Sequence, residues 1–415
     1  MGSDADFSGA NALGRAVRDP ALPTLADAFD AEAIARGFEA AWSDVQRESP
    51  APTVIGGRAD TAYAPGSSCV VTYPVALQSR EDEPQRTAFG VVEVDAAGTR
   101  FRRFVDDPAM PGLVVAADAA VVSNRLSAAV GNGEWRPVPI RYKPGRSCVL
   151  RYAAVSREPV YGKVFARDAE RHAEVLAGLD EAGAADPQMP RIAAPVAVLP
   201  ELCMIVQPEV SGRSLSEAAN DPSPSIRAMC LRAAGTALAA LHATTMPARR
   251  TVRWQDDVSE LAGYLPLFLA LAPEIAPSSH EVVRRLQEAT RTVSNVRLVP
   301  SHGACRTDQF VLRDDGAIVA LDLDTYCYAD PARDLANILG YLEWHGIRNS
   351  PDAAAAVSLI EGYESMAPLP AADRMELYRA VTVLRIAGRR LRRLAFHEWQ
   401  HLPALVARAC DALSL

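Results

Sequence analysis

The sequence predicts a mixed α+β fold whose front half is rich in strands and whose second half is mostly helical. Two strand patterns, over residues 54–104 and 138–165, are rich in apolar and β-branched side chains and are separated by turn residues. From residue 224 onward helical patterns dominate, with one strand-rich interruption over residues 298–322. A chain of 415 residues is long for one domain, so two or three domains are expected.

Further elements complete this outline. Residues 26–47 predict an amphipathic helix, because Phe29, Ile34, Phe38 and Trp42 recur at helical intervals. Residues 168–183 predict another helix, and residues 196–210 predict two strands joined by a turn at Pro200. Asp95–Gly98 predicts a turn within the first strand pattern.

The composition excludes several classes of protein. Apolar residues make up 49% and charged residues 23%, which is ordinary for a soluble globular protein. The net charge of −8 disfavours a general nucleic-acid binder. The sequence has no apolar run long enough to span a membrane and no secretory signal, so a cytoplasmic protein is expected. The seven cysteines occur singly, which favours buried free thiols over disulfides or a zinc site.

Two segments of the strand-rich half resemble each other. Residues 63–73 (YAPGSSCVVTY) align without gaps on residues 142–152 (YKPGRSCVLRY). Further on, Phe89-Gly-Val91 aligns with Tyr161-Gly-Lys163, and the DPAMP segment at Asp107 echoes DPQMP at Asp186. The pattern predicts a partly duplicated unit whose first copy has lost the lysine, with Val91 in its place. Coincidence in a biased composition is the alternative.

A carboxylate-rich hairpin is the strongest chemical signal. Two apolar strands flank the turn Arg313–Gly316, which places Gln309 and Asp322 near each other at neighbouring strand ends. Strand alternation places Asp322 and Asp324 on one face. Two carboxylates and an amide oxygen suit a Mg²⁺ ion that holds nucleotide phosphates. In the alternative, the two aspartates only end a strand and cap the next element.

Three motifs in this region occur in the order and spacing of a known family. They are His302-Gly303 followed by Gln309, then Leu321-Asp322-Leu-Asp324, then Asp330-Pro-Ala-Arg-Asp334-Leu-Ala336. The region from about residue 138 to 394 resembles the aminoglycoside phosphotransferase and choline kinase-like family. The resemblance implies a bilobal protein kinase-like fold, with a small β-rich lobe at 136–210 and a large helical lobe at 211–415. Residues 1–135 would form an extra N-terminal module that partly repeats the small lobe.

The resemblance also implies a site for Mg²⁺ and ATP or another nucleoside triphosphate. Lys163 would contact the phosphates, with Glu174 or Glu170 holding the lysine. The residues expected to complete the site are Gly145 and Ser147 in a phosphate-covering turn, Gln207 and Glu209 beside the adenine, and Gln309, Asp322 and Asp324 on the metal. The substrate would be a small molecule with a hydroxyl group. A segment at 254–260 (WQDDVSE) is a candidate acidic wall for a cationic acceptor.

The sequence departs from the family at one position. Ala304 stands where the family has the aspartate that orients and deprotonates the substrate hydroxyl, and loss of such a base costs about 10²–10⁴-fold in rate. His302 is expected to order the loop, and Asp308 is a weak substitute base. Arg306 is a candidate for binding a phosphate or another anion.

Three explanations for Ala304 stay open. The chain is a pseudokinase that binds nucleotide as a regulatory or scaffold module, a transferase with altered chemistry, or a form inactivated by substitution. In the module interpretation, the basic helix face Arg385–Arg393 contacts a protein partner; otherwise that face is solvated.

Overall fold

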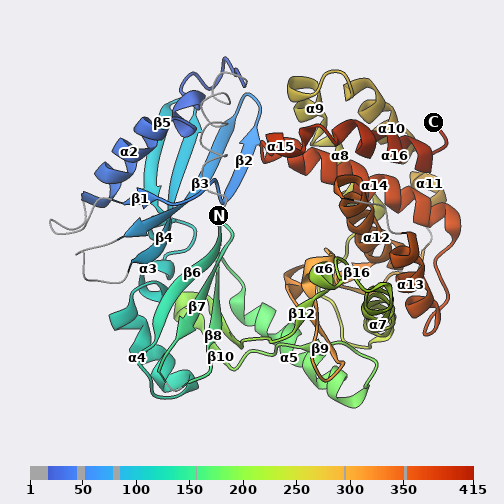
Figure 1. Ribbon diagram of the computed structural model, residues 1–415, viewed down its shortest axis with the longest axis horizontal. Coiled ribbons are helices and arrows are strands. Elements are labelled where there is room, and N and C mark those ends of the chain that lie inside the picture. Colours follow the sequence, from blue (N-terminus) through green and yellow to red (C-terminus); the bar gives the residue numbers. More distant parts are fainter. Residues whose placement is uncertain (1–16, 44–51, 78–84, 156, 294–295, 350–352) are drawn as a thin grey trace. The chain divides into compact units, whose positions relative to one another are not determined.

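The computed structural model describes residues 17–43, 52–77, 85–155, 157–293, 296–349 and 353–415. The chain divides into two compact units. Unit 1 comprises residues 1–171, 195–209 and 392–394, and unit 2 comprises residues 172–194, 210–391 and 395–415. Strands dominate the first half and helices the second, as predicted (Figure 1). No helix in the described ranges is long and apolar enough to cross a bilayer.

Unit 1 contains two five-stranded antiparallel sheets (Figure 1). In the first, β2-β3-β4-β5 are neighbours and β1 also pairs with β3; in the second the order is β6-β7-β8-β11-β10. The strands are β1 (Thr53–Val54), β2 (Asp60–Ala64), β3 (Ser68–Leu77), β4 (Arg86–Asp95), β5 (Gly98–Arg103), β6 (Arg136–Lys143), β7 (Ser147–Ala153), β8 (Val160–Phe165), β10 (Ala197–Leu199) and β11 (Met204–Pro208). The predicted turns at 95–98 and at Pro200 are both present.

One helix covers the first sheet. Helix α2 (Ala31–Ser43) buries Ile34, Phe38 and Trp42, so the predicted helix is confirmed over this range. Of the predicted helix 26–47, residues 26–28 belong instead to the 3₁₀ helix η1 (Leu25–Ala28), and residues 44–47 lie outside the described ranges. The Phe38 ring centroid lies 5.8 Å from that of Phe101 on β5, which fixes the helix against the sheet. The other short helices of unit 1 are η2 (Phe104–Asp106), α3 (Leu113–Ala116), α4 (Ala119–Val130) and η3 (Pro200–Leu202).

The two aligned segments form hairpins of the same register. Tyr63 pairs with Cys69 across β2 and β3, and Tyr142 pairs with Cys148 across β6 and β7. The glycines at the turns also match, with φ of +70° at Gly66 and +67° at Gly145. The repeat therefore extends from the sequence to the backbone. The division into 1–135, 136–210 and 211–415 stays a prediction.

The register corrects one alignment. Lys163 pairs with Val149, and the corresponding position in the first copy, opposite Val70, is held by Glu93 rather than Val91. The alignment matched Gly90 with Gly162, but the two glycines are not equivalent. Each is required by a different aromatic ring that packs against it. A Cβ on Gly90 would lie 2.3 Å from the Phe38 ring, whereas a Cβ on Gly162 would lie 2.5 Å from the Tyr152 ring.

Unit 2 is mainly helical and contains two small sheets (Figure 1). Its strands are β9 (Arg191–Ile192), β12 (Arg213–Ser214), β14 (Phe310–Leu312) and β15 (Ile318–Ala320), in the order β12-β14-β15-β9, and the pair β13 (Val299–Ser301) and β16 (Cys327–Ala329). Its helices, beginning with α5, which starts in unit 1, are α5 (Ala169–Ala185), α6 (Leu215–Ala218), α7 (Pro224–Ala243), α8 (Trp254–Ala262), α9 (Leu265–Leu271), α10 (Ala276–Glu288), α11 (Thr290–Val293), η4 (Thr307–Gln309), η5 (Leu323–Thr325), α12 (Pro331–Arg348), α13 (Ala353–Glu364), α14 (Ala372–Arg392), α15 (Phe396–Trp399) and α16 (Leu402–Ala412).

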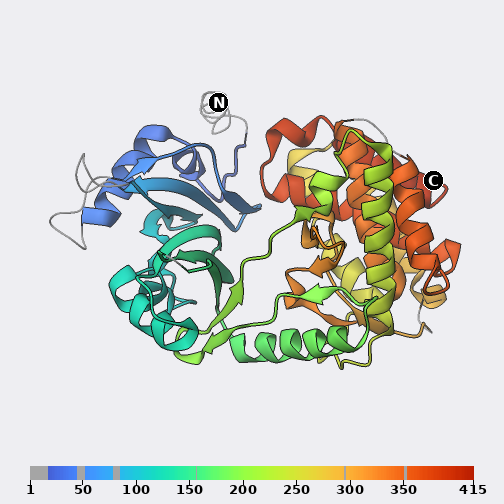
Figure 2. The same ribbon diagram turned by 60° about the horizontal axis from the view of Figure 1, so that its bottom comes forward.

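Helices α7 and α13 cross at close range, and Figure 2 shows α7 side-on along its whole length. A Cβ on Gly235 would lie 2.1 Å from the carbonyl oxygen of Leu359, and one on Gly362 would lie 2.0 Å from that of Arg232. Only glycines allow the two backbones to approach this closely. This contact lies in the middle of α7, and near the C-terminal end of the helix His242 contacts the Tyr363 hydroxyl of α13 at 2.9 Å.

The prediction of a solvated or partner-binding basic face on α14 is wrong over Arg385–Arg390. Arg385 is 3% exposed and pairs with Asp257 and Glu260. Arg389 pairs with Glu260, and the Nε atom of Arg390 lies 3.1 Å from Glu398. These arginines face acids of neighbouring helices, so they belong to the internal framework of unit 2.

Candidate functional site

The loop after β13 turns at Gly303, whose φ is +83°. A Cβ there would lie 2.2 Å from the carbonyl oxygen of Thr325, so the turn requires glycine. The buried carboxylate of Asp334 accepts hydrogen bonds from the backbone N–H groups of His302, at 2.7 Å, and Gly303, at 3.1 Å. Asp334, in the first turn of α12, thereby fixes the loop to that helix.

Two histidines complete the frame around Asp334. The Nε2 atom of His242 lies 3.4 Å from Asp334, and its Nδ1 atom lies 2.9 Å from the Tyr363 hydroxyl. His302 is fully buried, and its Nε2 atom lies 2.9 Å from the carbonyl oxygen of Leu321. Burial alone would raise the pKa of Asp334, yet the neighbouring His242, His302 and Arg333 lower it below its usual value.

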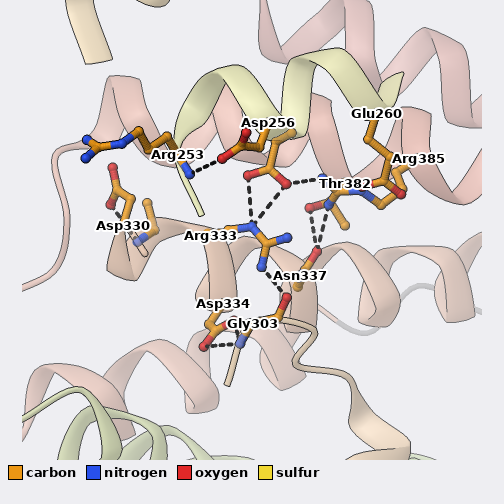
Figure 3. Close-up of polar contacts among 12 residues, drawn as sticks. Arg253, Asp256, Glu260, Gly303, Asp330, Arg333, Asp334, Asn337, Thr382 and Arg385 are labelled. Atoms are coloured by element: carbon orange, nitrogen blue, oxygen red, sulfur yellow. Dashed lines mark hydrogen bonds and ion pairs between the residues drawn. The ribbon is translucent and has the colours of Figure 1, made fainter. Parts of the chain in front are cut away.

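Arg333 extends the frame to two more helices (Figure 3). Its Nη1 atom donates to the carbonyl oxygen of Gly303, and its Nε atom lies 2.8 Å from Asp257 on α8. Asp257 is 1% exposed and also pairs with Arg385 of α14. Removing Asp257 would leave the buried Arg333 without its acidic partner, whereas Asp257 keeps one arginine when either of the two is removed.

Residue 304, where the resemblance predicts a catalytic aspartate, is an alanine. Ala304 offers no polar side-chain atom, and Asp308 is paired with Arg306 at 3.0 Å. The Arg306 guanidinium also lies 5.8 Å from the centre of the Tyr341 ring. Burial raises the pKa of the Cys305 thiol well above its usual value, which keeps it protonated and unreactive.

The predicted metal ligands Gln309 and Asp322 lie side by side. The Nε2 atom of Gln309 lies 3.4 Å from Oδ2 of Asp322, as the hairpin geometry predicted. The Oε1 atom of Gln309 is buried and has no hydrogen-bond partner among the described residues. An amide oxygen beside a carboxylate supplies the hard oxygen ligands that Mg²⁺ prefers.

Strand alternation was the wrong argument for Asp324. The strand β15 ends at Ala320, and Asp322 has left-handed backbone angles, with φ of 59° and ψ of 42°, at the start of η5. The chain thus turns at Asp322, and Asp324 lies inside the 3₁₀ helix. Within the described residues, no group of three His, Cys, Asp or Glu side chains is arranged to hold a metal. The roles of Gln309, Asp322 and Asp324 stay predictions.

Unit 1 contains the predicted phosphate- and adenine-binding residues. Lys163 lies on β8, between Val149 of β7 and Ile205 of β11, and its Nζ atom is 5.3 Å from the centre of the Phe165 ring. Gly145 is exposed at the turn between β6 and β7, and Ser147 begins β7.

The two residues predicted to lie beside the adenine are at the end of β11. Gln207 pairs with Tyr161 across the sheet, and Glu209 directly follows the strand. The Glu209 carboxylate accepts hydrogen bonds from Arg151 and Tyr161, and the Arg151 bond in particular lowers its pKa. The binding roles of these residues stay predictions.

Glu174 and the acidic segment 254–260 have arginine partners that the sequence did not indicate. Glu174, on α5, lies 2.6 Å from Arg249. In the segment 254–260, Asp257 is buried against Arg333 and Arg385, and Glu260 pairs with Arg385 and Arg389. The second finding corrects the expectation of an acidic wall for a cationic acceptor, because these two carboxylates are already neutralised by arginines.

The Arg333 network is the part of the site that sequence reasoning missed. Arg333 occupies a variable position of the Asp330–Asp334 motif, and Asp257 is 76 residues away along the chain. The available signal was an arginine inside the Asp330–Asp334 motif, whose burial was not predicted. Such an arginine requires an acidic partner, but its identity depends on how α8 and α14 pack.

A model of the family described as the phosphotransferase enzyme family matches residues 155–378, more than half of the chain. The chain belongs to this family. Membership supports a phosphotransferase function, as the three motifs predicted. No curated protein matches the sequence.

Solved structures show the same fold. One is spectinomycin phosphotransferase with ADP and spectinomycin, at 13% identity and a TM-score of 0.52, covering 72% of this chain and 99% of that one. Another is choline kinase from Cryptosporidium parvum Iowa II, at 9% identity and a TM-score of 0.50, covering 72% and 96%. The likeness confirms the predicted bilobal kinase-like fold class.

Proposed function

We propose that this protein binds Mg-ATP, or another nucleoside triphosphate, and transfers the γ-phosphoryl group to a hydroxyl of a small molecule. The observation that carries the proposal is the pair Gln309 and Asp322, with the amide oxygen of Gln309 buried and without a partner in the described structure. A buried polar atom without a partner costs free energy, about 1–3 kcal/mol, and a cation that binds this oxygen after a half-turn of the amide would stabilise the site.

The side-chain amide of Gln309 would respond to the metal. Its N–H now points toward Asp322 at a long 3.4 Å, whereas a cation between the two groups requires the oxygen there. A half-turn of the amide exchanges the two atoms. The metal would bridge the phosphates and neutralise their developing charge.

The repeat in unit 1 supports phosphate binding by its second copy. The second copy has Lys143 and Arg146 in its turn, where the first has Ala64 and Ser67. On the strand, Lys163 replaces an acid, Glu93. Basic residues at these positions suit a triphosphate, and the first copy lacks all three.

Ala304 sets the expected rate. In the transfer, the acceptor oxygen forms a bond to the γ-phosphorus, the bond from that phosphorus to the bridging oxygen breaks, and ADP leaves with the electron pair. Without a carboxylate at residue 304, the hydroxyl proton passes to a phosphate oxygen or to water. Positioning and electrostatics remain, so we expect slow but measurable turnover.

A nucleotide-binding module without turnover is the second candidate. It is favoured by the loop itself, since Ala304 has no proton acceptor and Asp308 is engaged by Arg306. The two functions share the nucleotide site and differ only in whether ADP is formed.

Calorimetric titration of Mg-ATP tests the shared site. Asp322→Asn should weaken Mg-dependent binding at least about tenfold, because a carboxylate ligand is lost. The matched control is Asp315→Asn in the same hairpin, where the carboxylate is exposed and caps the turn at Ala317. Equal ATP binding by wild type, both variants and metal-free protein would contradict the proposal.

A further inference from the structure

The two hairpin turns of unit 1 are each held by one aspartate. In the first copy, Oδ2 of Asp19 accepts hydrogen bonds from the Tyr63 hydroxyl, at 2.8 Å, and from the Gly66 N–H, at 2.7 Å. In the second copy, Oδ2 of Asp107 accepts from the Tyr142 hydroxyl, at 2.5 Å, and from the Gly145 N–H, at 2.7 Å. The same three groups therefore fix both turns.

The repeat includes the segment that leads into each copy. Asp19 begins the segment DPALP and Asp107 begins DPAMP, so the counterpart of Asp107 in the repeat is Asp19, rather than the Asp186 that the sequence comparison paired with it. The Tyr73 hydroxyl donates to the carbonyl oxygen of Ala28, at 2.7 Å, and the Tyr152 hydroxyl donates to that of Ala116, at 2.9 Å. Each of these alanines follows its aspartate at the same spacing.

The first copy also contacts the aspartate of the second. Arg102, on β5, donates from Nε to Glu93 at 2.8 Å and from Nη1 to the Tyr142 hydroxyl at 3.0 Å. Its Nη2 atom lies 3.8 Å from Asp107. Glu93, at the position that Lys163 holds in the second copy, thus holds the arginine that contacts the second turn.

The second turn is held by these contacts together with the hydrogen bond that the Ala166 N–H donates to the Arg146 carbonyl oxygen, at 3.0 Å. Gly145 is exposed, and an added Cβ would meet no atom within 4 Å, so packing does not fix the tip. The Asp107 carboxylate, whose side chain is only 2% exposed, holds the tip of the turn through its hydrogen bond from the Gly145 N–H. A loop that is already ordered loses less conformational entropy when a ligand binds.

We propose that the first copy of the repeat braces the turn Lys143–Ser147 and that Arg102 is a positioning residue for the triphosphate of the nucleotide. The inference rests on the proposed nucleotide site and assigns a role to the front half of unit 1. Glu93 orients Arg102, Arg102 orients Tyr142 and Asp107, and Asp107 holds the N–H of Gly145.

The test compares ATP with adenosine, which has no phosphates, by titration into the full chain. Asp107→Asn and Arg102→Gln should weaken Mg-ATP binding about tenfold and leave adenosine binding unchanged, because they loosen a turn that faces phosphate only. The matched control is Asp19→Asn, which weakens the same pair of hydrogen bonds in the first copy by replacing the carboxylate with a neutral amide. It should lower the melting temperature about as much as Asp107→Asn and leave ATP binding unchanged.

The outcomes separate this inference from the proposed function. Equal effects of Asp19→Asn and Asp107→Asn on ATP, or equal losses of ATP and adenosine binding, would overturn the bracing role while the nucleotide site stands. If Asp107→Asn does not fold, Arg102→Gln decides, and unchanged ATP binding in it overturns the inference. Absence of ATP binding in the wild type would refute the proposed function, and the bracing role with it.

Discussion

Arg333 donates to the carbonyl oxygen of Gly303 (Figure 3) and also pairs with the carboxylate of Asp257. One side chain thereby connects the loop that contains Ala304 to helix α8. Because Arg385 contacts the same carboxylate, the loop, α8, α12 and α14 share one buried network. The geometry of the loop is thus coupled to helices that are distant in the sequence.

Arg333→Met is expected to destabilise unit 2 by about 1–3 kcal/mol, because the Gly303 carbonyl loses its donor and the buried Asp257 keeps one arginine instead of two. Urea unfolding measures the loss. Arg284→Met is the control, since Arg284 is also a helical arginine between two acids, Glu281 and Glu288, but is solvent-exposed. Exposed pairs contribute little, so the control should unfold like the wild type. Equal unfolding free energies of the two variants would show that the buried network contributes no more to stability than an exposed ion pair.

Gly303→Ala is expected to cost more stability than Gly316→Ala. The two glycines have nearly equal φ, +83° and +84°, so the left-handed strain of about 1–2 kcal/mol is common to both. Only at Gly303 would the new Cβ meet an atom, the Thr325 carbonyl oxygen at 2.2 Å, whereas Gly316 faces open space. The difference between their unfolding free energies measures the steric part, and no difference would mean that the loop can shift freely.

Ala304→Asp is expected to raise the rate of phosphoryl transfer about 10²–10⁴-fold, by restoring a group that accepts the hydroxyl proton. ADP release in single-turnover experiments, with a panel of small hydroxyl compounds, provides the measurement. Ala304→Asn is the matched control, because it has nearly the same shape and no basic oxygen pair. Similar rates in the two variants would argue that proton removal does not limit the reaction, and no ADP formation in either variant would favour the binding-module function.

Stability is expected to fall in acid partly through Glu260. Burial would raise the pKa of this carboxyl, but Arg385 and Arg389 outweigh burial and lower it below the usual 4.5. A carboxyl with a lowered pKa in the folded state stabilises the protein above its unfolded pKa, and this stability is lost as pH falls through the folded value. Glu260→Gln should therefore flatten the dependence of the unfolding free energy on pH below about 4.5. A parallel curve for the variant would contradict the lowered pKa.

Local sequence patterns determined much of the fold and part of the site. Alternation and helical spacing located the strands of unit 1 and the helix that buries Phe38, because these signals depend only on residues near one another. The turn at Arg313–Gly316 sufficed to bring Gln309 beside Asp322, since a tight hairpin fixes the distance between its strand ends. The motif order was enough to recognise the family.

Tertiary structure decided which distant charges meet. Pairing counted from the Tyr-x-Pro-Gly turns placed Glu93, rather than Val91, at the position of Lys163, because hydrogen-bond register and not residue similarity aligns strands. Helix packing turned the arginines of α14 inward onto Asp257 and Glu260. The left-handed turn at Asp322 ended the alternation assumed for Asp324. Each of these outcomes depends on contacts between segments far apart in the chain, about which local patterns carry no information.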